Sequence, residues 1–210
     1  VQHLRAAVRS DTVALVRVTE LNIGQIKRAL DIGADGIVVP WIETPEQLRQ
    51  AVSFAHYPPT GLRGIGGERA TCWGRAIPEH VREAEENVLV VPIIETVRAG
   101  RNIEYLCQIP GVDLFQFGPA DYSSTAGFAG QWEGPGVASQ LLAIKDVIRK
   151  HGKQCGVLGT SHENLREREE QGFRFLGLGM DAGLLIRAIT ESLASTGRTA
   201  KLQTSFVPTS

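Results

Sequence analysis

Short apolar runs rich in β-branched residues alternate along this chain with longer segments of helical periodicity, and this alternation restricts the fold more than any other feature. The short runs, bounded by turn residues, favour strands, and the segments between them favour amphipathic helices. Strands separated by helices form parallel sheets, because each helix carries the chain back to the level at which the next strand begins. Six strands are predicted, at residues 12–18, 36–40, 87–94, 113–117, 154–158 and 173–178.

The helices expected between these strands have recognisable beginnings and ends. Thr44, Pro45 and Gln47 form a capping-box pattern that predicts the start of a helix ending near His56. Ser161 is expected to cap a very polar helix, and Gly152 to follow the end of an amphipathic one. Further helices are expected at residues 23–30, 137–150 and 182–193.

Polar residues at the carboxyl ends of several strands favour a barrel over an open sheet. Arg17, Glu43, Glu95 and Asp121 each follow or end a predicted strand. A (β/α) barrel collects all its strand ends in one ring, whereas an open sheet gathers only those near its switch point. Neither glycine cluster, at 64–67 or at 177–179, has the spacing of a nucleotide-binding fingerprint. The sequence therefore predicts an α/β barrel.

Composition narrows the class of protein. The 210 residues carry a formal net charge of −1 and are 42 % hydrophobic, which gives no reason to expect a nucleic-acid or membrane partner. No apolar run approaches the roughly 18 residues that span a bilayer. Cys72, Cys107 and Cys155 are widely spaced and are expected to be buried free thiols in a reducing cytoplasm.

Glu95 and Asp121 are the strongest candidates for chemistry. Each follows an apolar strand, in the segments VPIIET and FGPAD, where a buried carboxylate is costly unless it is paired or bound to a metal. Two carboxylates at neighbouring strand ends would repel each other, and a divalent ion such as Mg²⁺ or Mn²⁺ would remove that cost. The alternative is that they pair with nearby arginines or cap the following helices.

Arg17 ends the first predicted strand, and an arginine at a barrel mouth suits bidentate binding of a substrate carboxylate. Its alternative role is a structural ion pair with Glu95 or Asp31. No lysine ends a strand at the mouth, which argues against Schiff-base aldol chemistry. The glycine-rich loop at 57–75 is expected to contribute to the site, with Arg69 and Thr71 lining the side on which an aldehyde would bind.

At family level the chain resembles the HpcH/HpaI aldolases, which are metal-dependent (class II) 2-keto acid aldolases of the pyruvate/phosphoenolpyruvate superfamily. The resemblance runs from about residue 1 to residue 195 through the segments VALVRV, ALDIGADGIVVPWIET, YPPTGLRGIGGERAT, VVPIIET and PGVDLFQFGPADYS. It implies a (β/α)8 TIM barrel and a homohexamer, a trimer of dimers in which a C-terminal helix is exchanged between partner subunits. It also implies a divalent metal cofactor, Mg²⁺, Mn²⁺ or Co²⁺.

The same resemblance assigns roles to particular residues. It implies that Glu95 and Asp121 bind the metal, and that Arg17 holds the 2-keto acid and stabilises the enolate oxygen. Asp31 is expected near the metal-bound waters. The turn of Gly118, Pro119, Ala120 and Asp121 is expected to bind substrate, the backbone amides of Ala120 and Asp121 receiving the pyruvate carboxylate.

This chain departs from the family pattern at its beginning. The family's general base is a histidine in an Asp-x-Glu-His motif, and that segment is expected upstream of Val1, together with the first strand, first helix and second strand of the barrel. The five histidines present fall on predicted helices or at their ends, where solvated side chains are expected. The predicted organisation is an N-terminally incomplete barrel domain, residues 1–195, followed by a tail, 196–210.

The function expected from these features is cleavage or formation of the C3–C4 bond of a 4-hydroxy-2-keto acid, giving pyruvate and an aldehyde through a metal-stabilised enolate. One alternative is a lyase of the citrate-lyase β type acting on a CoA thioester, although the chain shows no extra basic patch for CoA phosphates. The other is a non-catalytic barrel subunit, if the base is absent from the protein. The sequence leaves open the identity of the aldehyde and of the preferred metal.

Overall fold

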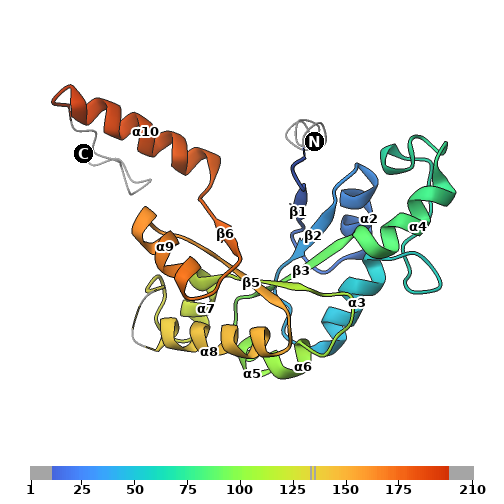
Figure 1. Ribbon diagram of the computed structural model, residues 1–210, viewed down its shortest axis with the longest axis horizontal. Helices are drawn as coiled ribbons and strands as arrows, with labels where there is room; N and C mark the ends of the chain where they lie inside the picture. Colours follow the sequence, from blue (N-terminus) through green and yellow to red (C-terminus); the bar gives the residue numbers. More distant parts are fainter. Residues whose placement is uncertain (1–10, 133, 135, 199–210) are drawn as a thin grey trace, which may run out of the picture.

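The computed structural model describes residues 11–132, 134 and 136–198. Its six strands form one parallel sheet in the order β1-β2-β3-β4-β5-β6, curved into a half-barrel with β1 and β6 at its two edges (Figure 1). The strands are β1 (Leu15–Arg17), β2 (Gly36–Val39), β3 (Leu89–Ile94), β4 (Leu114–Phe117), β5 (Gln154–Leu158) and β6 (Phe175–Gly177). Sequential order and parallel pairing are the arrangement that repeated strand–helix units produce.

Helices connect these strands and cover the outer face of the sheet, except for α10, which follows the last strand (Figure 1). They are α2 (Ile23–Asp31), α3 (Pro45–Ala55), the 3₁₀ turn η1 (Arg69–Thr71), α4 (Ile77–Asn87), α5 (Val97–Arg101), α6 (Ile103–Leu106), α7 (Pro119–Thr125), α8 (Val137–Lys150), α9 (His162–Glu170) and α10 (Asp181–Ser195). The capping box predicted at Thr44 and Gln47 is present at the start of α3, and Ser161 caps α9 as expected.

Alternate residues of each strand face opposite sides of the sheet. Ile37, Val39, Ile94, Phe115 and Phe117 are 0–1 % exposed and pack with the apolar faces of the helices in one core. Their neighbours along the same strands, such as Val38, Ile93 and Gln116, therefore face the inner side of the half-barrel. Arg17 faces the same side, because it is in register with Val38. All six strands are parallel, so their carboxyl ends lie along one edge of the sheet. Side chains on the inner face near that edge are therefore brought close together.

The predicted strands are confirmed in number and order, but all except β5 are shorter than expected, β1 and β6 by the most. β1 spans three residues instead of the seven predicted, and β6 also spans three. Several helices were not predicted, above all α4, whose only buried residue is Ala84. Ile77, Val81 and Ala84 recur at helical spacing in α4, but so few apolar residues among so many charged ones give a weak signal. The half-barrel agrees with part of a TIM barrel, and the closed eight-stranded form stays a prediction.

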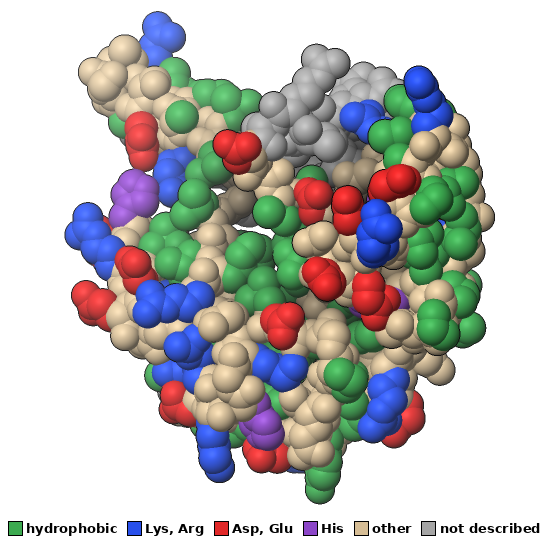
Figure 2. Space-filling view, turned by 45° about the vertical axis from the view of Figure 1, so that its right-hand side comes forward, with side chains coloured by type: hydrophobic (Ala, Val, Ile, Leu, Met, Phe, Trp, Pro, Cys, Tyr) green, Lys and Arg blue, Asp and Glu red, His purple; other side chains and the backbone are tan. Residues whose placement is uncertain are grey.

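Helix α10 stands away from the body of the molecule, to which β6 connects it (Figures 1 and 2). None of its residues is buried, although it carries Leu184, Leu185, Ile186 and Ile189, each at least 44 % exposed. No helix among the described residues is both long and apolar enough to cross a membrane. The tail predicted from residue 196 onward lies outside the described residues from residue 199.

The three cysteines are free thiols, as predicted, but only two of them are buried. Burial raises the pKa of Cys107 and of Cys155 to about 11, so both remain protonated near neutrality. Cys72 is exposed, contrary to the prediction, because it follows η1 at the surface in a left-handed conformation with φ of 51°. No pattern of apolar residues around Cys72 showed in advance that it would be exposed while Cys107 and Cys155 are buried.

Candidate active site

Glu95 lies directly after β3 and is 3 % exposed. Its Oε1 accepts a hydrogen bond of 2.7 Å from the backbone N–H of Trp41, which follows β2. Trp41 adopts a left-handed backbone conformation with φ of 54°, which for a non-glycine residue costs about 1–3 kcal/mol. A strained backbone therefore directs a donor at the buried carboxylate. Sequence analysis missed this role of Trp41, because a backbone donor leaves no mark in the side-chain pattern.

The environment of Glu95 disfavours its charged form. Burial is the main cause and raises the pKa of Glu95, and the nearby carboxylate of Asp121 raises it further. The Trp41 N–H and the guanidinium of Arg17 act in the opposite direction and lower this pKa, without cancelling the rise. Glu95, Asp121 and Arg17 thus interact electrostatically, as the strand-end argument predicted. We refer to Glu95 and Asp121 as the carboxylate pair.

Asp121 is exposed and lies in the first turn of α7, after Gly118 and the buried Pro119. Pro119 at the start of a helix is favourable, because a first-turn N–H has no acceptor within the helix. The N–H groups of Ala120 and Asp121 lack helical acceptors for the same reason. The turn from β4 into α7 therefore brings the predicted substrate-binding residues together at one edge of the sheet.

Gly118 lies directly against Glu95. A Cβ atom at position 118 would lie 2.8 Å from Glu95 Cβ and 2.9 Å from Glu95 Oε2, closer than non-bonded atoms approach. Glycine here is thus a packing requirement of the carboxylate pair, since its φ of −107° is open to any residue.

We expect Gly118→Ala to displace Glu95 and to destabilise the protein by about 1–3 kcal/mol, as overpacking does. Thermal unfolding with and without Mn²⁺ measures both the loss of stability and the loss of metal-induced stabilisation. Gly183→Ala in α10, where a Cβ meets nothing within 4 Å in the described chain, is the control and should not lower the Tm, because alanine is the better helix former. An unchanged Tm for Gly118→Ala would contradict the close packing.

Arg17 ends β1, and its side chain is exposed at the carboxyl edge. Its charge acts on Glu95, in agreement with the predicted location beside the pair. Glu43, the remaining strand-end carboxylate, has a structural role. It accepts a hydrogen bond of 2.8 Å from Thr96 Oγ1 and lies 3.2 Å from Arg98, so it joins the segments that follow β2 and β3.

Asp31 is held elsewhere. It ends α2, and a helix that connects parallel strands ends at the edge of the sheet opposite to the carboxyl ends. Its carboxylate pairs with Lys27 and, at 3.1 Å, with the buried guanidinium of Arg63. The described chain therefore does not bring Asp31 to the carboxylate pair, and the role expected for it near metal-bound water lacks support from this geometry.

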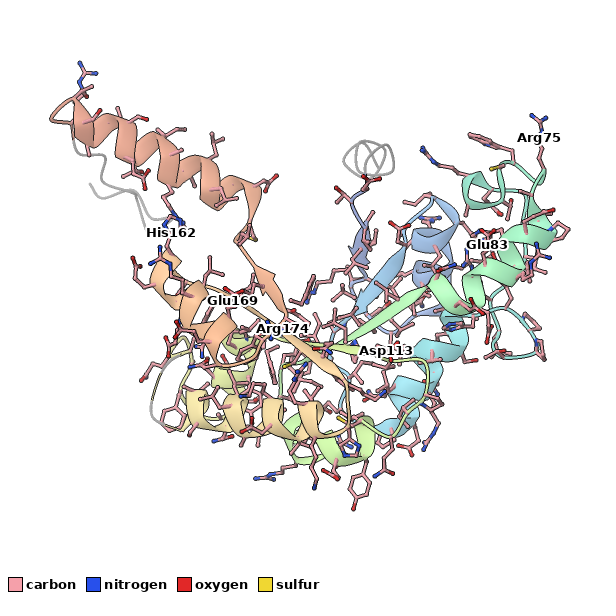
Figure 3. All side chains as sticks on the ribbon, viewed as in Figure 1. Arg75, Glu83, Asp113, His162, Glu169 and Arg174 are labelled. Carbon is pink, nitrogen blue, oxygen red and sulfur yellow. The ribbon has the colours of Figure 1, made fainter. Side chains whose placement is uncertain are left out.

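The loop residues Arg69 and Thr71 lie in η1, next to the end of α2. The Thr71 hydroxyl, which is buried, bonds to the carbonyls of Gly66 and Glu68 at 2.9 and 3.0 Å. Arg69 lies over Gly33. Figure 3 shows Arg75 and Glu83, in the same region, far from the α9–α10 side where His162 lies. Contacts within the described chain thus give Thr71 a role in shaping the loop, and contact of either residue with an aldehyde stays a prediction.

Three described histidines have partners or locations away from the pair. His56 is buried, contrary to the expectation of a solvated side chain, because its Nδ1 lies 2.8 Å from the Val52 carbonyl. His151 pairs with Glu104 at 3.0 Å. His80 packs edge-on against Tyr57, and burial lowers its pKa. None of the three is placed to serve the carboxylate pair.

The residues at this edge fit a divalent cation. A buried carboxylate beside a second one, with a pKa raised by both effects, is an unfavourable arrangement that a cation relieves. Within the described ranges, no three side chains of His, Cys, Asp or Glu come together in a way suited to a metal ion. The pair would therefore supply two oxygen ligands and leave the other coordination positions to water and substrate.

Comparisons with known proteins find relatives named as aldolases. A model of the HpcH/HpaI aldolase/citrate lyase family matches residues 1–188. The chain is 35 % identical to the hydroxypyruvate/pyruvate aldolase of Delftia acidovorans, over 93 % of this chain and 72 % of that protein. It is 36 % identical to the 4-hydroxy-2-oxovalerate aldolase of Rhodococcus jostii, over 88 % of this chain and 71 % of that protein.

A solved structure shows the same fold. It is that of an HpcH/HpaI aldolase/citrate lyase family protein from Burkholderia cenocepacia, with a TM-score of 0.87 and 29 % sequence identity. The match covers 92 % of this chain and 77 % of that one.

Proposed function

Since the chain belongs to the HpcH/HpaI aldolase/citrate lyase family, we propose that it is a metal-dependent aldolase that cleaves or forms the C3–C4 bond of a 4-hydroxy-2-keto acid. Relatives named as aldolases, about 35 % identical to this chain, support aldolase or lyase activity. The observation that carries the finer proposal is the pair of Glu95 and Asp121, a buried and an exposed carboxylate that interact at the carboxyl edge.

Glu95 and Asp121 would hold the divalent ion, which we expect to be Mg²⁺, Mn²⁺ or Co²⁺. When bound, the ion supplies a Lewis acid that stabilises negative charge on the keto oxygen of the substrate. Glu95 suits this role because the Trp41 N–H occupies Oε1 and fixes the orientation of the carboxylate. Gly118 lets the turn into α7 approach Glu95 closely enough for Asp121 to share one cation with it.

Arg17 binds the substrate carboxylate or the developing enolate in this proposal. Its guanidinium is permanently charged and lies close enough to act on Glu95. The free N–H groups of Ala120 and Asp121, in the first turn of α7, add donors for a carboxylate. Together these groups orient a 2-keto acid and stabilise negative charge at its oxygens.

Proton transfer is assigned to a histidine that the family resemblance puts upstream of Val1. The alternative of a CoA-thioester lyase is less favoured, because the aldolase names belong to relatives at 35–36 % identity. A non-catalytic barrel is favoured only if the protein as made in the cell has no such base. Buried free thiols at Cys107 and Cys155 suit a reducing cytoplasm, where we expect the enzyme to act.

The proposal predicts release of pyruvate from 4-hydroxy-2-keto acids only when a divalent ion is present. We expect EDTA to abolish turnover, and Mg²⁺, Mn²⁺ or Co²⁺ to restore it to different extents. A coupled assay for pyruvate with a panel of 4-hydroxy-2-keto acids of different chain length measures this and identifies the preferred aldehyde. Full activity in excess EDTA would contradict the proposal.

Helix α10 supports the proposed assembly, a trimer of dimers with exchanged C-terminal helices. An amphipathic helix with no buried residue has an unfavourable exposed apolar face, which a second copy of the chain would cover. That the partner covering α10 is a second copy of this chain is what the family resemblance implies.

We expect the double variant Leu185→Asp/Ile189→Asp to dissociate the oligomer, because these residues, four apart, share one face of α10 and are 61 % and 50 % exposed. Light scattering after size exclusion gives the mass. Ala194→Asp is the control, since it lies about 180° around the helix from Leu185. An unchanged mass for the double variant would rule out this face as the interface.

A further inference from the structure

Gln116 is a polar residue on the inner face of β4. It stands between Phe115 and Phe117, which are 0 % and 1 % exposed among the helices, so its side chain faces the inner side of the half-barrel. Its amide oxygen Oε1 is buried and has no hydrogen-bond partner among the described residues. A buried acceptor without a donor costs about 1–3 kcal/mol, which calls for an explanation.

The orientation of the amide is fixed by its other atom. Gln116 Nε2 donates to the carbonyl oxygen of Phe117 at 3.2 Å. Exchanging the two amide atoms would bring two acceptors together, so the free group is the oxygen. The site therefore offers an acceptor, and the group that satisfies it must carry an O–H or N–H.

The oxygen lies against a glycine. Gly156 of β5 is in register with Gln116, and a Cβ atom at Gly156 would lie 2.5 Å from Gln116 Oε1. The oxygen thus occupies the position that a side chain on β5 would take.

Gln116 lies one inward position below the carboxylate pair. It is in register with Ile93, two residues before Glu95, and it precedes Gly118, which touches Glu95, by two residues. Two residues of a strand rise about 6.6 Å. A small acid held at the pair and extending into the barrel would therefore come within reach of the amide.

We propose that Gln116 determines which 2-keto acid this enzyme accepts, by receiving a hydrogen bond from a hydroxyl on carbon 3, next to the keto carbon. The inference rests on the proposed function and adds the substrate class to it. An ionised 2-keto acid without a hydroxyl carries only acceptor oxygens, which cannot satisfy Oε1. A 3-hydroxy-2-keto acid carries the missing donor.

The hydroxyl on carbon 4 of an aldol substrate is a poorer partner for this oxygen. It must lose its proton as the C3–C4 bond breaks, and a neutral amide oxygen is too weak a base to take that proton. A hydrogen bond to Gln116 would hold the proton in place. The hydroxyl on carbon 3 keeps its proton throughout, so its interaction with the amide is compatible with the reaction.

The test compares the binding of hydroxypyruvate and pyruvate by titration calorimetry, using the full chain loaded with Mn²⁺. We expect the wild type to prefer hydroxypyruvate, and Gln116→Met, which keeps the length of the side chain but removes the acceptor, to lose about tenfold of that preference. Affinity for pyruvate should remain or improve, because the methyl group of pyruvate then meets an apolar side chain. Gln108→Met makes the same change at an exposed position and should leave both affinities unchanged.

The outcomes separate the two proposals. If the wild type binds both acids and Gln116→Met leaves their ratio unchanged, the oxygen holds only water, and the inference about Gln116 fails while the aldolase proposal stands. If the metal-loaded wild type binds neither acid, the aldolase proposal fails and the inference falls with it. Gln116→Glu, which keeps an acceptor in place, should retain the preference if Gln116→Met fails to fold.

Discussion

Glu95→Gln is expected to lower kcat/KM for pyruvate release by about 10³-fold while making the metal-free protein more resistant to heat. The first effect follows because a neutral amide is a poor ligand for a hard divalent ion. The second follows because the substitution removes a buried charge that lies beside Asp121. An amide oxygen at the same position can still accept the hydrogen bond from Trp41, so the fold should be preserved.

The gain in stability should depend on pH in a definite direction. The pKa of Glu95 is raised above its usual value near 4.5, so between that value and the raised one the folded state binds more protons than the unfolded state. The destabilising contribution of Glu95 therefore develops as the pH rises through that interval. The difference in Tm between Glu95→Gln and wild type, measured in EDTA, should grow from pH 4 toward pH 7.

The matched control is Glu46→Gln, the same change at an exposed residue in the first turn of α3. It should leave kcat/KM and Mn²⁺ binding unaltered. Asp121→Asn should lose activity as Glu95→Gln does, but with a smaller change in Tm, because Asp121 is exposed. Full activity in either Glu95→Gln or Asp121→Asn would refute the assignment of the carboxylate pair.

Arg17→Leu should lower kcat/KM by about 10²–10³-fold, because it removes the only cation that the structure shows acting on Glu95 among the described residues. Arg17→Lys should recover part of this loss, since it restores the charge without the two-pronged geometry of the guanidinium. Steady-state kinetics with a 4-hydroxy-2-keto acid would measure both variants. Arg49→Leu, on the exposed face of α3, is the control and should be neutral.

A second measurement separates the charge of Arg17 from a structural role. Arg17 lowers the pKa of Glu95, so its removal should raise that pKa further. The pH profile of thermal stability measured in EDTA, which reports ionisation of Glu95, should then move to higher pH in Arg17→Leu. A profile that keeps its position while the rate falls would show that Arg17 acts through the substrate alone.

The sequence predicted the elements that place the candidate site but not all of the contacts that build it. The strand ends at Arg17, Glu95 and Asp121 were visible because polar residues interrupt apolar runs there. Asp31 was expected near the metal from the family resemblance alone, and the structure pairs it with Lys27 and Arg63. That pairing depends on where α2 ends relative to the loop carrying Arg63, and local sequence does not encode this distance.

Glu95 and Asp121 were at first only two carboxylates at neighbouring strand ends. Residue alternation and strand order were enough to predict the parallel sheet, its core and this edge, because they depend on the local period of the chain and on the short connections between neighbouring elements. Only the tertiary structure decided that Trp41 donates to Glu95, that Gly118 packs against it, and that Gln116 lies over Gly156 with a free oxygen. These contacts join segments far apart in the chain, so they exist only once the sheet has formed.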